Sequence, residues 1–286
     1  MKGLKRQLNI LYETFDAKYL STDPLEYVHR FKDARDQEIV GLIASSLAYG
    51  KVRQILSSIE RVMEVMRWRP YEFTMNFKPA EDKELFKGFV HRFSGGEDIA
   101  CLIYFARQMI EDSGTIEGFF MNGVSSGDRN VKGALASFSK RVLGLDSEPI
   151  YRKRRLPEDA GVRFFFPSPE GGSPCKRLNL YLRWMVRRKD HLDLGLWRKI
   201  SPSKLVIPLD THTARISRNV GLTKRQSPSW KMAEEITQNL IRFDPEDPIK
   251  YDFALCRLGI LEYCPKDMDM EKCQKCLVRE MCLLII

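Results

Sequence analysis

Four cysteines close to the C-terminus have the spacing of a metal site. They form the pattern C-x8-C-x2-C-x5-C and are Cys264, Cys273, Cys276 and Cys282. Thiolates are the soft ligands that hold iron–sulfur clusters and structural zinc, and gaps this short let one loop bring four sulfurs to one centre. Zinc sites more often contain two C-x2-C pairs, and this tail contains one, so the pattern favours an iron–sulfur cluster over zinc. The remaining cysteines, Cys256 among them, are expected to be buried small apolar residues.

A second group of polar side chains, around Asp210, follows a short apolar run. The run at 205–209 leads into Asp210-Thr211-His212-Thr213. We expect a helix at 211–219 with Asp210 as its N-cap, because aspartate accepts hydrogen bonds from the free amides of a first turn and stays ionised there. A carboxylate in this position can also stabilise a positive charge or accept a proton.

A glycine-rich turn precedes Lys176. It reads Gly171-Gly172-Ser173-Pro174-Cys175, and a helix is expected after it at 176–189. Gly171 and Gly172 can bring backbone amides close to a phosphate, because they carry no side chain. A lysine in a pocket near other cations can act as a nucleophile, since its amine loses its proton more readily there. Contact with a phosphate, or simple solvation, is the alternative for Lys176.

The charge of the chain is unevenly distributed. It contains 47 basic and 38 acidic residues, which give a formal net charge of +9, and the stretch 151–204 holds 14 Lys and Arg against five acidic residues. Such an excess suits a polyanionic partner, and a solvated helix face explains it equally well. The sequence has no long apolar run and no recognisable signal peptide, so we expect no membrane span and a cytoplasmic location.

The pattern of apolar residues predicts an all-α protein. Strand signals are few and no internal repeat is visible, so we expect a single helical domain over 1–286. Residues 145–175 are rich in proline, glycine and charge and predict an irregular connection. The expected helices cover 4–20, 36–49, 52–66, 82–92, 97–112, 115–123, 129–143, 176–189, 211–219, 230–242 and 248–261.

The C-terminal part resembles the iron–sulfur members of the helix–hairpin–helix DNA glycosylases, the endonuclease III superfamily. Their tail reads C-x6-C-x2-C-x5-C, and the last three cysteines here match it, whereas the gap after Cys264 is two residues longer. Upstream, Leu209-Asp210-Thr211-His212-Thr213-Ala214-Arg215-Ile216 is similar to the family's V-D-T-H-x-x-R-V, which carries the catalytic aspartate. The two motifs stand in the family's order and together cover 205–282.

The rest of the chain matches this family less closely. The segment at 43–49, which ends in Tyr49, looks like the early helix of these enzymes that leads into a DNA-probing loop. The family's hairpin L-P-G-V-G-x-K/T is not present in that form, and the turn before Lys176 stands near the expected place. Lys176 precedes Asp210 by 34 residues. This spacing is closer to the archaeal 8-oxoguanine glycosylase branch, which has a longer insert.

The resemblance implies a fold and a set of site residues. It implies two helical subdomains flanking a DNA-binding cleft, with a structural 4Fe-4S cluster in the loop 264–282. Asp210 would stabilise the charge that develops on the sugar, and Lys176 would attack C1′ and form a Schiff base. An aromatic side chain, from Trp184 or 164–166, would stack on an extruded base, although such residues more often belong to the core.

Other residues are expected at the DNA surface. Tyr49 would wedge into the duplex or simply lie at the surface of a helix end, and His212 would pack or donate a hydrogen bond. The arginines of the helix at 176–189, chiefly Arg177 and Arg183, would contact phosphates without reading sequence, which predicts strongly salt-dependent binding.

The sequence therefore favours a monomeric DNA glycosylase, with or without lyase activity, that acts on damaged or abasic double-stranded DNA. Two other functions are compatible with it. One is a non-catalytic nucleic-acid-binding protein on the same scaffold, and the other is a zinc-stabilised helical protein with an RNA or protein partner.

Overall fold

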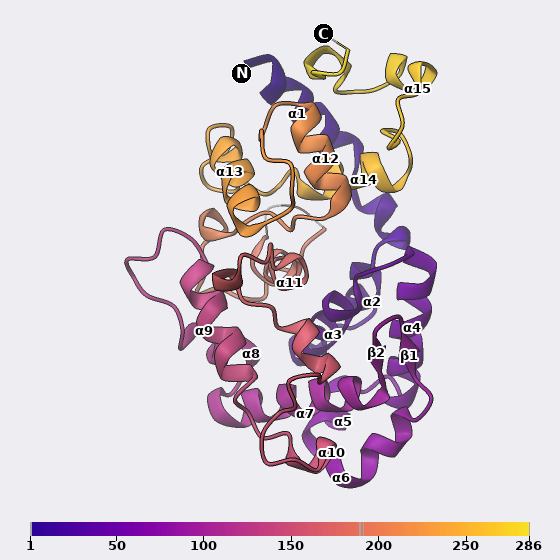
Figure 1. Ribbon diagram of the computed structural model, residues 1–286, viewed down its shortest axis with the longest axis vertical. Helices are drawn as coiled ribbons and strands as arrows, with labels where there is room; N and C mark the ends of the chain where they lie inside the picture. Colours follow the sequence, from indigo (N-terminus) through magenta and orange to yellow (C-terminus); the bar gives the residue numbers. More distant parts are fainter. Residues whose placement is uncertain (1, 189, 191, 286) are drawn as a thin grey trace.

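The two ends of the chain meet at one end of the molecule. In the computed structural model, which describes residues 2–188, 190 and 192–285, helix α1 (Lys2–Thr14) packs beside α14 (Asp252–Ile260) (Figure 1). Leu4, Leu8 and Leu11 recur at helical spacing and are buried, which is why α1 forms an amphipathic helix and docks. The Tyr251 hydroxyl, next to α14, donates to Asn9 Oδ1 over 2.8 Å. The upper part of the molecule is thus built from both termini.

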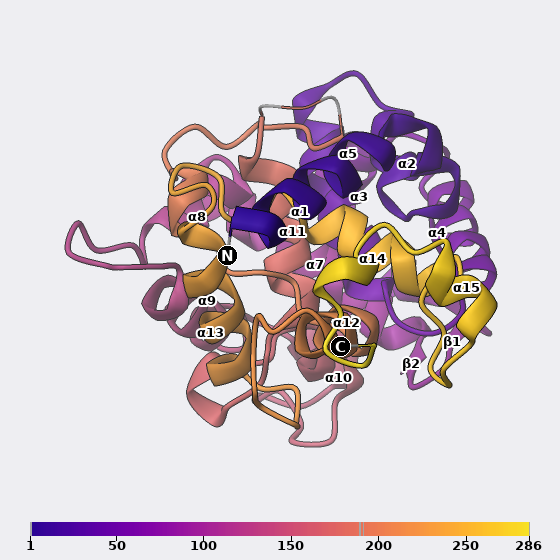
Figure 2. The ribbon, with the colours of Figure 1, turned by 90° about the horizontal axis from the view of Figure 1, so that it is seen from above.

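The upper part also contains two helices that the sequence predicts, α12 and α13, and two short ones in the tail that it does not. They are α12 (Thr211–Asn219), α13 (Trp230–Ile241), α15 (Met270–Gln274) and the 3-10 helix η6 (Arg279–Met281). In the view from above, α1, α14 and the cysteine-containing tail face the viewer (Figure 2).

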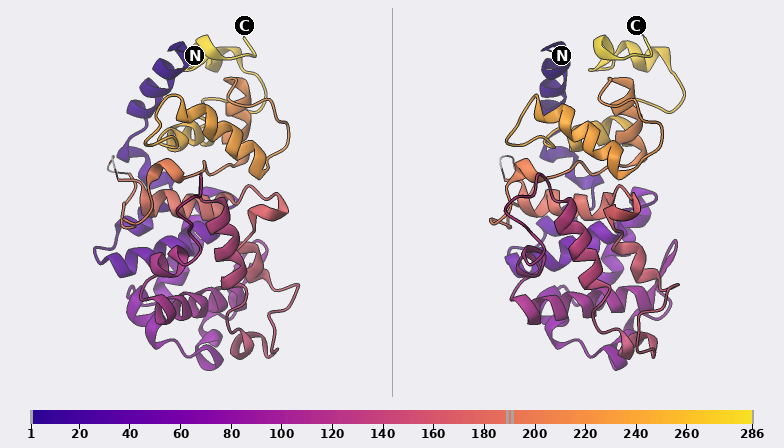
Figure 3. Two further views of the ribbon diagram at one scale, coloured as in Figure 1. Left: turned by 90° about the vertical axis from the view of Figure 1, so that its left-hand side faces the viewer. Right: turned by 60° about the vertical axis from the view of Figure 1, so that its left-hand side comes forward.

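The middle of the chain forms the lower part, and the side views show these purple and magenta helices below the orange and yellow ones (Figure 3). Its α-helices are α2 (Leu25–His29), α3 (Ala34–Leu47), α4 (Val52–Val65), α5 (Pro70–Asn76), α6 (Pro79–Asp82), α7 (Gly96–Ser113), α8 (Ile116–Met121), α9 (Lys132–Val142) and α10 (Glu148–Tyr151). Its shorter elements are η1 (Ala17–Thr22), η2 (Lys83–Phe86) and the strands β1 (Val90–His91) and β2 (Ser94–Gly95).

Helix α11 (Lys176–Val186) runs through the interior between the two parts. Every residue from Arg177 to Val186 is buried, and the helix packs on α3. The Tyr181 hydroxyl donates to Glu38 O over 3.0 Å. Gly41 leaves room for α11, because a Cβ at this position would lie 2.5 Å from the methyl carbon of Met185. A helix buried on all sides must pair its own charges.

Buried ion pairs meet those charges. Arg183 bonds to Asp252 over 2.6 Å and to Asp193 over 3.3 Å. Arg187 bonds to Asp247 over 2.9 Å and also to Asp193 and Asp190. A buried charge is tolerated only when it is paired and hydrogen-bonded. Part of the basic excess of 151–204 is therefore neutralised by acidic side chains inside the protein. This corrects the expectation that the helix presents its arginines to DNA.

Most expected elements are present, and one is wrong. The all-α class is confirmed, since among the described residues the strands β1 and β2 form the one small sheet. The expected helix at 82–92 is instead η2 followed by β1, because Lys87 and Gly88 turn the chain there. The connection 145–175 is largely irregular, with the short helices α10, η3 (Gly161–Phe165) and η4 (Pro169–Gly171). None of the described helices is long and apolar enough to cross a membrane.

Candidate active site

A large cleft lies where the upper and lower parts meet. Its volume is about 1320 Å³. One wall comes from the loop between α3 and α4 and from Arg92, which lies in the turn of the hairpin formed by β1 and β2. The other wall comes from the start of α12, from α14 and from 265–267. Lys176 and Asp210 both line it. The exposed side chains of Lys51, Arg92 and Lys266 add positive charge to its walls.

Asp210 is the N-cap of α12, as its sequence predicts. Its Oδ1 accepts a hydrogen bond from Thr213 N over 2.7 Å. The preceding run at 205–209 is buried and has no regular secondary structure, and Ile207 N donates to Thr237 Oγ1 of α13 over 3.1 Å. This buried segment fixes the point at which Asp210 enters the cleft.

The second carboxylate oxygen of Asp210 has a partner from α14. The Cys256 thiol donates to Asp210 Oδ2 over 3.4 Å. We expected Cys256 to be a plain apolar core residue, and the structure corrects this, since Cys256 lines the cleft. Burial and the neighbouring Asp210 raise the pKa of the thiol well above its usual value, so it stays a protonated donor.

Asp252 lies one helical turn before Cys256 on the same face of α14, and it also lines the cleft. The pKa of its carboxyl is raised to about 6, chiefly by burial. Arg183 and Lys176 oppose this rise, and Asp210 adds to it. Lys176 and Asp210 thus both act electrostatically on Asp252 and on Cys256. The spacing of four residues between Asp252 and Cys256 on a helix is the sequence signal that could have revealed this pair.

Lys176 is the first residue of α11, and its amine points back to the loop after α3. Its Nζ donates to Ala48 O over 2.8 Å. The turn before it begins with Gly172, which adopts φ +80°, and Cys175 adopts a left-handed φ of 47°. The element directly before this turn is the 3-10 helix η4 and not an α-helix. The turn therefore differs from a hairpin between two α-helices.

Gly171 and Gly172 are exposed, with open space where a Cβ would lie. Neither glycine is among the residues that line the cleft with Lys176 and Asp210. Gly172 O accepts a hydrogen bond from Trp230 N over 3.0 Å, which ties the turn to the start of α13. The Gly172 amide is already used, since it donates to Pro169 O over 3.1 Å.

His212 and Tyr49 both line the cleft. His212 packs closely on α14, because a Cβ at Gly259 would lie 2.4 Å from its Nδ1. The Tyr49 hydroxyl bonds to both strands of the small sheet. It donates to His91 O over 2.9 Å and lies 2.8 Å from Ser94 Oγ. Its ring is half-buried, and the ring centroids of Tyr49 and Phe164 are 5.1 Å apart. Tyr49 thus supports the cleft wall and is not free to swing out as a wedge.

The two arginines expected at the DNA surface lie elsewhere. Arg183 is only 2% exposed and is paired with Asp193 and Asp252, so its role is structural. Arg177 is also buried. Its guanidinium lies 3.6 Å from the ring centroid of Phe164, Nη2 donates to Phe164 O, and burial lowers its pKa to about 10. Of the aromatic candidates, Trp184 is fully buried, whereas Phe164 is 44% exposed.

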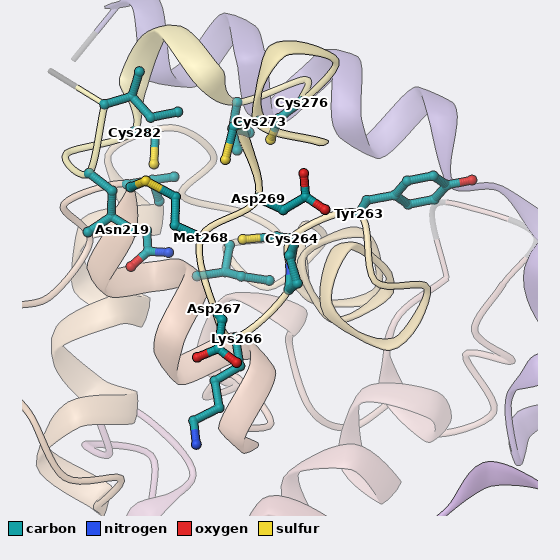
Figure 4. Close-up of a pocket in the computed structure, with 16 residues that line it drawn as sticks. Asn219, Tyr263, Cys264, Lys266, Asp267, Met268, Asp269, Cys273, Cys276 and Cys282 are labelled. Carbon is teal, nitrogen blue, oxygen red and sulfur yellow. The ribbon is translucent and has the colours of Figure 1, made fainter. Parts of the chain in front are cut away.

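The four tail cysteines surround a second, smaller cavity. Its volume is about 40 Å³, and all four side chains line it, with Met268 and Asp269 beside them (Figure 4). Cys273, Cys276 and Cys282 lie above the cavity in this view and Cys264 lies below it, and their sulfurs are directed to the same space (Figure 4). Across the described part of the chain, no group of three or more His, Cys, Asp or Glu residues is arranged so that it could hold a metal ion. All seven cysteines are free thiols.

Arg215 connects the aspartate motif with the cysteine cavity. Its guanidinium donates to Cys264 O over 2.5 Å, to Pro265 O over 2.7 Å and to Cys264 Sγ over 3.2 Å. Arg215 also lines the cleft. One helix, α12, therefore carries Asp210 at its start and holds the beginning of the cysteine loop one turn later.

The comparisons with known proteins identify a family. The model of DUF2400, described as a protein of unknown function, matches residues 23–261, and the chain belongs to this family. The matched region includes Lys176, Asp210 and Cys256 and ends before the four tail cysteines. No curated protein and no solved structure matches the chain.

Proposed function

We propose that this protein is a DNA-repair glycosylase that excises a damaged base from double-stranded DNA, and that Lys176 gives it AP-lyase activity. One observation carries the proposal, namely that Asp210 and Lys176 line the same cleft although 34 residues separate them. The exposed cations Lys51, Arg92 and Lys266 on its walls suit a phosphate backbone. We also infer a monomeric protein of the cytoplasm, where thiols stay reduced.

The chemistry follows from the two side chains. The lone pair of the Lys176 amine forms a bond to C1′, the bond from C1′ to the base nitrogen breaks, and the electron pair leaves with the base, which takes up a proton. The Asp210 carboxylate stabilises the positive charge on the sugar and accepts the proton that the amine loses. The nitrogen lone pair then expels O4′, which takes up a proton, so that the sugar ring opens and a Schiff base forms. Loss of a C2′ proton from this Schiff base breaks the bond to the 3′ oxygen, and the 3′ phosphate leaves with the electron pair.

The four tail cysteines would be the donor set for a 4Fe-4S cluster. Their lining of one cavity supports this proposal, and zinc is the alternative for the same donors. The cluster's contribution would be structural. Arg215, through its bonds to Cys264, would transmit the order of this loop to α12 and Asp210.

Borohydride trapping tests the proposal. The wild type should form a covalent adduct with abasic-site DNA, and Lys176→Ala should form none, because the nucleophile is gone. Lys87→Ala is the matched control, since this lysine is exposed and does not line the cleft. An adduct that survives Lys176→Ala would remove Lys176 from the mechanism. Base release from a lesion panel that Asp210→Asn leaves intact would reject the role of Asp210.

One observation favours a second function, a non-catalytic nucleic-acid-binding protein. The Lys176 amine is hydrogen-bonded to Ala48 O and must leave this partner to attack a sugar. A binding protein would use the same basic cleft, with salt-sensitive affinity and no product on any lesion. The lesion panel separates the two functions, because base release that is lost in Asp210→Asn excludes a purely binding role.

A further inference from the structure

The small hairpin presents an exposed aromatic side chain beside the cleft. Strands β1 and β2 pair Val90 with Gly95 and His91 with Ser94, which leaves Arg92 and Phe93 as a two-residue turn. Phe93 is 73% exposed. Its neighbour Arg92 lines the cleft and packs over Gly50, where a Cβ would lie 2.9 Å from Arg92 Cδ. The tip of the hairpin therefore stands at the rim of the cleft.

The base of the hairpin is firmly held. Tyr49 binds both strands through its hydroxyl, as described above. The ring of His91 is buried, with Nδ1 2.8 Å from Ser58 Oγ and Nε2 3.1 Å from Tyr49 O. These bonds join the hairpin to α4 and to the loop after α3. A rigid base and an exposed tip suit a side chain that must push into another molecule.

Behind the tip, aromatic rings continue toward the cleft wall. The ring centroids of Phe93 and Phe164 are 6.3 Å apart, and those of Phe164 and Tyr49 are 5.1 Å apart. Cations accompany them, since the guanidinium of Arg92 lies 5.4 Å from the Phe93 centroid and that of Arg177 covers Phe164. We call Phe93, Phe164 and Tyr49 the aromatic row.

We propose that Phe93 stacks on the bases of DNA next to the nucleotide that enters the cleft, filling the gap that this nucleotide leaves. The inference rests on the proposed function and names the element that holds the opened duplex. Nucleotides fit this surface, because their bases offer flat π-faces to an aromatic ring and their phosphates attract the charges of Arg92 and Lys51. An apolar protein partner would leave these exposed cations without counter-charges.

The test uses duplex DNA with a tetrahydrofuran abasic analogue and the fluorescent base 2-aminopurine beside it. The wild type should bind this duplex more tightly than an intact one and change the 2-aminopurine emission, because Phe93 replaces the lost stacking. Phe93→Ala should lose about tenfold in affinity for the abasic duplex, together with the emission change, as expected for the loss of one aromatic–base stack. Phe93→Trp should retain both.

Leu85→Ala is the matched control, because Leu85 is 54% exposed in η2 and does not line the cleft. It should behave as the wild type. An unchanged emission response in Phe93→Ala, or no binding of the wild type to either duplex, overturns the inference. Base release by a wild type whose emission response survives Phe93→Ala would leave the proposed function standing and reject the stacking role. The reverse result, stacking without any product, would reject the glycosylase activity alone.

Discussion

The Cys256 thiol and Thr213 N hold the two oxygens of the Asp210 carboxylate, at 3.4 Å and 2.7 Å respectively. The thiol comes from α14 and the amide from α12, and these helices pack against each other. The carboxylate therefore cannot rotate without losing a partner. Pre-organised orientation of this kind is what a group needs to stabilise charge at one atom of a substrate.

The first prediction concerns Cys256. Cys256→Ala should lower the rate of base release about fivefold with little change in DNA affinity, because the loss of one hydrogen bond is worth about 1 kcal/mol. Cys256→Ser keeps an O–H donor and should restore most of the rate. Single-turnover kinetics with each variant measure this. Equal rates in the alanine variant and the wild type would mean that the thiol does not position Asp210.

The second prediction concerns the tail cysteines. Anaerobically purified protein should contain iron and acid-labile sulfide, and Cys276→Ser should lose both, because one of four thiolate ligands is missing. Cys101→Ser is the matched control, since Cys101 is a buried thiol on α7, far in sequence from the four tail cysteines. Elemental analysis decides the matter. Zinc without sulfide in the wild type would replace the cluster by a zinc site.

The sequence was informative where a local pattern determines the structure. The N-cap role of Asp210 and the bounds of α12 follow from local hydrogen bonding at a helix start, and both are confirmed. The shared cavity of the tail cysteines agrees with their short spacing. In each case neighbours in the sequence are also neighbours in space.

The sequence was misleading where long-range packing decides. Arg183 looked like a surface residue because its charge is normally solvated, and its partners Asp193 and Asp252 are recognisable only in the fold. The hairpin at 90–95 was missed because its strands are two residues long and are fixed by Tyr49 and Ser58 from other elements. Cys256 acquires its role only because α14 packs on α12.

The third prediction tests the buried ion pairs. Arg183→Met should lower the free energy of unfolding by about 3–5 kcal/mol, because it leaves the buried carboxylate of Asp252 without its paired cation and removes one of the two arginines that pair with Asp193. Arg30→Met is the control, since Arg30 forms a partly exposed pair with Glu26 and should cost less than about 1 kcal/mol. Chemical denaturation measures both. Equal losses would show that the buried network is no more important than a surface pair.

The fourth prediction concerns the protonation of His91. The carbonyl of Tyr49 can only accept, so Nε2 carries a proton, and in the neutral ring Nδ1 accepts from the Ser58 hydroxyl. Burial, together with the nearby Arg92 and Arg177, lowers the pKa of His91 below its usual value of 6.5. Below pH 6.5 the unfolded chain therefore takes up a proton that the folded ring refuses, and the free energy of unfolding falls as the pH falls.

An NMR titration of the imidazole resonances measures this pKa directly, with His91→Gln to assign the signal. The loss of stability between pH 6.5 and the folded-state pKa should be smaller in His91→Gln, because glutamine does not titrate. The hairpin should also loosen as the ring becomes protonated, since a second N–H would face the Ser58 hydroxyl and the bond to Nδ1 would have to reverse. A His91 pKa at or above 6.5 would contradict the neutral ring and weaken the argument that the base of the hairpin is firmly held.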